Sequence, residues 1–83
     1  MRVFRIQVID SEEPYHYEGT QSAAHKYAKE LPKHQWEQAK ITELDVQTDK
    51  EGILALMNDD PIITDTGPSF GLTKRGGLKP WVE

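Results

Sequence analysis

The sequence contains no cysteine and no long apolar run. The missing cysteine excludes a disulfide framework and a thiolate-ligated zinc site. No stretch approaches the roughly 18 apolar residues of a membrane-spanning helix. The first residues, Met1-Arg2-Val3-Phe4, lack the layout of a signal peptide. These absences exclude a membrane protein and a disulfide-stapled secreted scaffold, so we expect a cytoplasmic location.

Apolar side chains are also scarce. The chain has 83 residues, of which 36 % are hydrophobic and 29 % are charged. A chain of this length forms one domain and buries only roughly 60–65 % of its unfolded surface. We therefore expect a small core, little room for a buried pocket, and no multidomain enzyme.

Charge is unevenly placed along the chain, whose net charge is −4. Residues 1–65 hold 13 acidic and 7 basic side chains, whereas residues 66–83 hold Lys74, Arg75 and Lys79 against Glu83 alone. An acidic body disfavours nucleic-acid binding, because lysine and arginine contacts to phosphates supply most of that affinity. A basic end of this kind is typical of an interaction tail.

The first half of the chain carries clear strand and helix patterns. Alternation of Phe4, Ile6 and Val8 with polar residues predicts a strand over 2–9. A polar turn with a proline separates it from a short strand over 15–18, and the two pair as an antiparallel hairpin. A helix follows with an apolar stripe at i, i+3, i+4 and i+7. The stripe consists of Ala24, Tyr27, Ala28 and Leu31, with Thr20 or Ser22 as N-cap and Pro32 as the stop.

The middle of the chain predicts a connector, a strand and a short helix. Residues 33–38 form the connector, with the Trp36 indole over a core edge. In the strand over 39–48, Leu44 and Val46 point inward, which places Ile41 on the other face and indicates a late start or a bulge. The helix begins after Thr48 or Asp49 and is weakened at Gly52 by about 1 kcal/mol. Residues 62–64 form a further short strand.

The C-terminal segment is rich in glycine and proline, which argues against a helix. It is either mobile or a loose hairpin with 70–72 on one arm and 78–82 on the other. We therefore predict a compact domain over 1–65 and a basic tail over 66–83, docked or mobile. The fold class is α+β, a small antiparallel sheet with element order β-β-α-β-α, a short C-terminal strand or hairpin, and helices packed on one face.

No catalytic or metal-binding constellation emerges from the sequence. His16, His25 and His34 lie nine residues apart on different predicted elements, which is not a zinc spacing. Ser69 has glycines at nucleophile-elbow spacing but no helix after it. The paired carboxylates fall in predicted turns and caps, where acids are solvated. We expect no enzyme activity, no cofactor and no metal.

The turn over 73–77 has two interpretations. Backbone N–H groups and two flanking cations could cradle a phosphate, with Phe70 and Trp81 stacking on bases. The order of residues is not that of a Walker loop, and the acidic body favours an ordinary solvated turn. Nucleic acid is therefore an unfavoured partner.

Aromatic residues in the tail favour a protein partner, because tryptophan and tyrosine often anchor interfaces. In size and layout the chain is similar to many small proteins of phages and mobile elements. Our first hypothesis is a non-enzymatic interaction protein, an inhibitor or regulator that covers a surface of a larger protein. The alternative is a nucleic-acid-associated accessory protein that uses the basic tail. Unpaired sheet edges also allow a homodimer. The candidate partner-binding residues are Phe70, Lys74, Arg75, Lys79 and Trp81.

Overall fold

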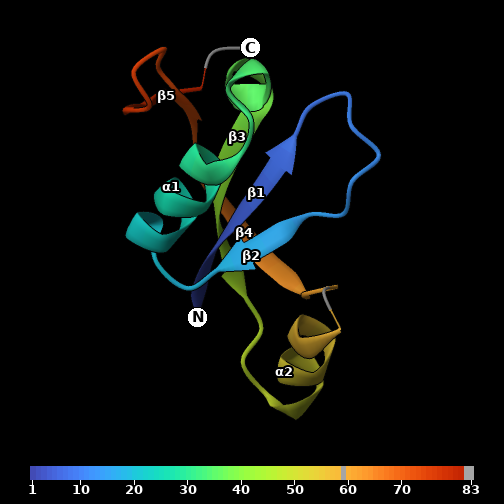
Figure 1. Cartoon of the computed structure of the whole chain (residues 1–83). Coiled ribbons are helices and arrows are strands. Elements are labelled where there is room, and N and C mark those ends of the chain that lie inside the picture. The colour runs from blue at the N-terminus through green and yellow to red at the C-terminus, as the bar shows by residue number, and fades with distance from the viewer. Residues whose placement is uncertain (59, 82–83) are drawn as a thin grey trace.

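The computed structural model describes residues 1–58 and 60–81. Five strands form one antiparallel sheet in the order β2-β1-β3-β4-β5, with two α-helices and one 3₁₀-helix outside it (Figure 1). The elements are β1 (Arg2–Val8), β2 (His16–Glu18), α1 (Gln21–Glu30), η1 (Lys33–Gln38), β3 (Ala39–Val46), α2 (Lys50–Met57), β4 (Ile63–Leu72) and β5 (Leu78–Pro80). The predicted α+β class with a small antiparallel sheet is confirmed.

The N-terminal hairpin forms as predicted. β1 pairs antiparallel with β2, with Phe4 opposite Glu18 and Ile6 opposite His16. The loop between them includes Asp10, whose φ of 63° lies in the left-handed region that aspartate tolerates better than most residues.

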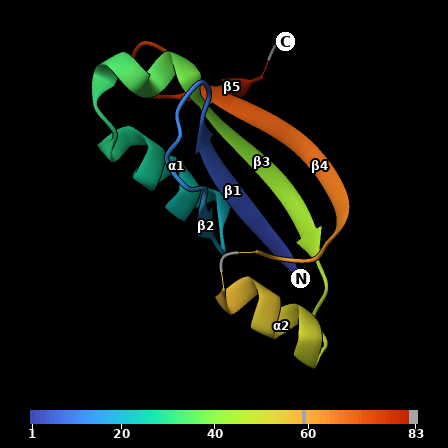
Figure 2. The same cartoon turned by 90° about the vertical axis from the view of Figure 1, so that its right-hand side faces the viewer.

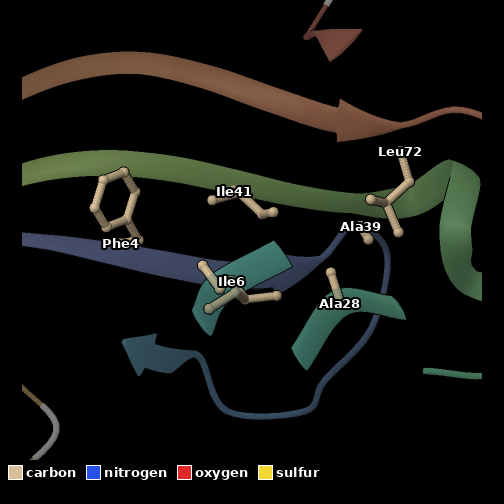
Figure 3. Packing of buried hydrophobic residues seen from close by; sticks show 7 residues of the cluster. Phe4, Ile6, Ala28, Ala39, Ile41 and Leu72 are labelled. Atoms are coloured by element: carbon tan, nitrogen blue, oxygen red, sulfur yellow. The ribbon is translucent and has the colours of Figure 1, made fainter. Parts of the chain in front are cut away.

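α1 lies against one face of the sheet because its inward stripe is thin (Figure 2). Ala24 and Ala28 are fully buried, and Ala28 points toward Ala39 of β3 (Figure 3). The helix starts at the predicted N-cap, where the Thr20 hydroxyl accepts a hydrogen bond from the Ala23 N–H at 3.1 Å. It ends at Glu30, two residues before Pro32.

β3 contributes to a core on both faces of the sheet. Ala39 and Ile41 face the α1 side with Ile6, whereas Leu44 and Val46 belong to a second cluster with Val3. Ile41 therefore lies on the face opposite Leu44 and Val46, as the alternation places it, and its side chain is fully buried there. The late start or bulge that this placement indicated is wrong. The strand starts at Ala39 without a bulge of its own, and the apolar pattern changes face because each face has its own cover.

The glycine-rich segment forms the far side of the sheet. β4 pairs with β3 along its length, and two register shifts each place an extra residue in β4. β4 and β5 pair with Phe70 opposite Pro80 and Leu72 opposite Leu78, so a hairpin forms with 70–72 on one arm and 78–80 on the other. Residue 82, the end of the predicted second arm, lies outside the described residues. Leu72 is 3 % exposed within the α1-side core. The predicted boundary between 65 and 66 falls inside β4, and residues 66–72 and 78–80 of the predicted tail belong to the sheet.

α2 lies beyond the end of the sheet and covers little of it (Figure 2). Its Leu56 packs against the cluster of Val3, Leu44 and Val46 on the face opposite α1. α1 therefore packs on one face of the sheet, whereas α2 contacts the opposite face at its end. The molecule is long, with principal extents of 40 × 22 × 22 Å.

Candidate functional site

The five residues predicted to bind a partner all lie on the β4–β5 hairpin. Phe70 is partly buried and packs against the core, so its ring contributes to the fold. Lys74 and Arg75 are exposed in the turn, Lys79 is exposed on β5, and Trp81 follows β5 half-buried.

The turn between β4 and β5 uses its own backbone donors. The N–H of Gly76 donates to the Thr73 carbonyl at 2.9 Å, and the N–H of Gly77 donates to the Thr73 hydroxyl at 2.9 Å. His25 of α1 contacts the Gly76 carbonyl through Nε2 at 2.5 Å. The phosphate cradle considered for 73–77 therefore lacks its two glycine donors, and any anion there would meet side chains instead.

A pocket of about 390 Å³ opens between this turn and η1. η1 brings Trp36 to its wall, where the indole N–H donates to the Leu31 carbonyl at 2.9 Å. The β4–β5 turn comes close to Trp36 because residue 76 is glycine. A Cβ there would lie 3.3 Å from the Trp36 ring. The lining residues are Lys33, His34, Trp36, Glu37, Leu72, Thr73, Lys74 and Lys79.

A second pocket of about 240 Å³ adjoins the first and shares Glu37 and Lys79 with it. Its remaining lining residues are Pro80 and Trp81. Trp81 is held by its backbone N–H, which donates to the Ser69 carbonyl at 3.0 Å. The ammonium of Lys40 lies over the Trp81 ring, 5.5 Å from its centroid.

These two pockets and the adjoining turn form what we call the basic end. Its charged residues are Lys33, Glu37, Lys40, Lys74, Arg75 and Lys79. Five positive charges and one negative charge give +4, and since the whole chain carries −4, the rest of the chain carries −8. The basic end thus gathers more cations than the tail sequence alone indicated, because Lys33 of η1 and Lys40 of β3 join those of the hairpin.

The opposite end of the molecule is apolar. Large exposed hydrophobic side chains gather there on α2, at the start of β4 and at the N-terminus, which lies beside α2 in both views (Figures 1 and 2). We call this set the apolar end; its members are Met1, Ile53, Leu54, Met57 and Ile63. Val46 of β3 lies beside both Met1 and Ile63. It pairs with Ile63, and its N–H donates to the Met1 carbonyl at 2.8 Å.

Helical geometry explains why α2 exposes so much apolar surface. Gly52 is buried and Leu56, four residues later, is partly buried, so this stripe faces the body. Ile53 and Met57 form the next stripe at the same spacing, and they are 37 % and 76 % exposed. The 52 % exposed Leu54 lies beside them.

A pocket of about 370 Å³ lies next to α2, lined by Met1, Arg2, Val3, Tyr17, Glu18, Gly19 and Leu56. Burial raises the pKa of Tyr17, an effect that the nearby Arg5 opposes only in part. The Tyr17 phenol is therefore neutral at ordinary pH and adds no charge to the lining of this pocket.

His16 and His25 make contacts within the fold. His16 stacks on Tyr27 with ring centroids 3.7 Å apart, and its Nε2 lies 2.7 Å from a Glu18 carboxylate oxygen. Within residues 1–58 and 60–81, no group of three or more His, Asp or Glu side chains is placed to hold a metal ion. Over the same residues, no helix combines the length and the apolar character needed to cross a membrane.

Sequence reasoning missed part of both ends. Lys33, His34 and Trp36 join the hairpin only because η1 folds back beside it, and no local pattern signals that. The dense apolar run over 53–57 in a helix of eight residues was the available signal for the apolar end. A helix that short cannot bury so many apolar residues from one side.

No family model, curated protein or solved structure matches this chain.

Proposed function

We propose that this protein is a non-enzymatic protein-binding module, an inhibitor or regulator that covers a surface of a larger protein with its apolar end. One observation carries the proposal. Of the six large hydrophobic side chains exposed among the described residues, five lie at the apolar end and only Tyr15 lies elsewhere. Contiguous exposed apolar surface on a small protein is typical of an interaction site.

The geometry of α2 favours helix-in-groove recognition. Ile53 and Met57 are one turn apart, and Leu54 widens the same exposed face. Anchors at this spacing insert into an apolar groove on a partner. Methionine suits such a role because its flexible side chain adapts to an irregular surface.

Acidic side chains outnumber basic ones on and beside α2, where Lys50 is the one basic residue of the helix, and they define the chemistry of the partner. Asp49, Glu51 and Asp60 are exposed beside α2. A partner with an apolar groove and a basic rim would match both features, since complementary rim charges speed association and select the partner.

The test starts with a photo-crosslinking amino acid at position 57 and, as a control, at exposed position 26 of α1. The protein captured from position 57 is then purified, and its affinity is measured for the wild type and for Leu54→Asn/Met57→Asn. Buried apolar anchors typically contribute about 2 kcal/mol, so we expect a loss of affinity of about thirtyfold. Tyr15→Asn, which makes a similar change at the remaining exposed hydrophobic residue, should leave the affinity unchanged.

Two results would contradict the proposal. One is equal affinity of the purified partner for the wild type and for Leu54→Asn/Met57→Asn. The other is a wild-type dimer in sedimentation velocity that the same double variant dissociates, because the occupant of the apolar end would then be a second copy of this chain. The double variant and the control Tyr15→Asn replace exposed residues only. The free energy of unfolding of each should therefore change by less than about 0.5 kcal/mol.

A further inference from the structure

We infer that the basic end binds single-stranded nucleic acid, with one nucleotide at each of its two adjoining pockets. The inference concerns the end of the molecule opposite the apolar end and does not depend on the proposed protein partner. The total charge of the sequence disfavoured such a ligand. The structure changes that assessment because it separates the charges and brings both tryptophans of the chain to one surface.

Each pocket pairs a tryptophan with lysines. Lys33 lies over the Trp36 ring at 5.8 Å, and Lys40 lies over the Trp81 ring at 5.5 Å. The Lys33 contact is long and its side chain is exposed, so a base can take the place of the Lys33 ammonium over the Trp36 ring. Lys40 is half-buried and keeps its place, and a base reaches Trp81 through the second pocket, which Lys40 does not line. Stacking of bases on aromatic rings beside lysines is how single-strand binders hold a strand without reading its sequence.

The shared wall of the two pockets fits the phosphate that links two nucleotides. Lys79 lines both pockets, while Lys33 and Lys74 line the first. A phosphate at the junction would therefore meet Lys79, with the other two ammonium groups on one side of it. Glu37 also lines both pockets, and among residues 1–58 and 60–81 no other carboxylate does so. Its negative charge repels the ligand. Removing this charge should therefore strengthen binding, whereas removing the lysine charges should weaken it.

The acidic side chains on and around α2 lie at the far end of the molecule and do not prevent this binding at physiological salt. Two other acids lie nearer and oppose the ligand as Glu37 does: Glu30 is three residues before Lys33, and Asp10 follows Ile9, whose N–H donates to the Gln38 carbonyl at 2.8 Å. Charges separated by more than the Debye length of about 8 Å are largely screened. The molecule is 40 Å long, and the hairpin turn with β5 lies at the end opposite α2 (Figures 1 and 2).

The test measures fluorescence anisotropy of a labelled oligodeoxythymidylate of about eight nucleotides, a length within the range that single-strand sites cover. We expect binding whose log–log salt slope is about −2 for three phosphate contacts. Lys74→Gln/Lys79→Gln should weaken binding about tenfold and reduce the slope to about −0.7, the value for one contact. Trp81→Ala should weaken binding about tenfold, the typical loss for one stacked base. Glu37→Gln should strengthen binding.

The matched control is Lys26→Gln/Lys50→Gln, which removes the same charge from exposed positions on α1 and α2. It should keep the wild-type affinity and slope. Equal weakening by the two double variants would overturn the inference, because the strand would then respond to net charge alone. Absence of binding at about 50 mM salt, or equally tight binding of a polyglutamate peptide, would also overturn it. The peptide result would show that the basic end takes an acidic protein segment instead.

Discussion

At the scale of single residues, Gly52 sets how closely α2 approaches the body. A Cβ at this position would lie 2.6 Å from the Gln47 carbonyl carbon and 2.8 Å from the Gln47 Cβ. No side chain fits at such distances without moving α2 away from the end of β3. The glycine that weakens the helix in isolation is therefore the residue that allows it to dock.

Gly52→Ala tests this contact. Helix propensity alone predicts a gain of about 1 kcal/mol, whereas the clash predicts a loss of about 1–3 kcal/mol in the free energy of unfolding. Urea denaturation of both proteins decides the sign. Gly19→Ala is the matched control, since a Cβ there meets nothing within 4 Å. A stabilised Gly52→Ala protein would show that α2 does not rest on Gln47.

Asp49 links the docking of α2 to pH. Its carboxylate accepts hydrogen bonds from the Gly52 N–H at 2.8 Å and from Gln47 Nε2 at 2.7 Å. These bonds, the Gly52 one most of all, lower the pKa of Asp49 below 3.8. Because the folded pKa is the lower one, the stabilisation is complete above the unfolded value and is lost as pH falls through the folded value.

We therefore expect the amide signals of α2 in NMR spectra to broaden or shift as the pH falls below 3.8, the ordinary value for this carboxyl. Asp49→Asn keeps an acceptor oxygen but does not titrate in this range, so its α2 signals should be insensitive to the same acidification. Identical acid responses in the two proteins would mean that another group controls α2.

At the scale of elements, β4 and β5 decide whether the N-terminal part can stand alone. Ending the chain at Asp65 removes most of β4, all of β5, and the buried Leu72. It also leaves Ile41 and Thr42 of β3 without their partners Phe70 and Ser69. We expect residues 1–65 to lack a cooperative thermal transition in circular dichroism, whereas the full chain shows one. A cooperative melt of the shortened chain would support the separate domain over 1–65 that the sequence predicts.

Local elements could be predicted from the sequence wherever a single pattern determined them. The alternation around Ile6 and the Thr20–Pro32 boundaries of α1 are of this kind. The alternation placed Ile41 on the correct face but did not show that this face is buried too, because period-two alternation assigns only one buried face to a strand. The surroundings of Trp36 and Leu54 could not be predicted, since they depend on how η1 and α2 settle against distant parts of the sheet.

At the scale of the whole molecule, a long body separates two chemically different ends. The sheet links an apolar surface around α2 to a basic surface around the β4–β5 turn (Figure 2). A protein of this shape can engage a partner at one end without covering the other. The proposed protein contact and the inferred nucleic-acid contact are therefore compatible, and they can be abolished separately.

The stability of the whole molecule should not depend on metal. His16, His25 and His34 lie on β2, α1 and η1, and the first two already contact Glu18 and the Gly76 carbonyl. We expect the thermal midpoint of untagged protein to be the same with a chelator and with stoichiometric zinc. A reproducible rise of several degrees with zinc would contradict this, because a ligand that binds only the folded state stabilises it.

We propose the apolar end as the surface that contacts the protein partner. The most direct measurement is backbone amide NMR of the labelled chain during titration with the partner captured through position 57. We predict that the largest shifts fall on Ile53, Leu54, Met57 and Ile63, with the β4–β5 turn unchanged. Shifts confined to Lys74, Lys79 and Trp81 would contradict the claim and assign the protein contact to the basic end.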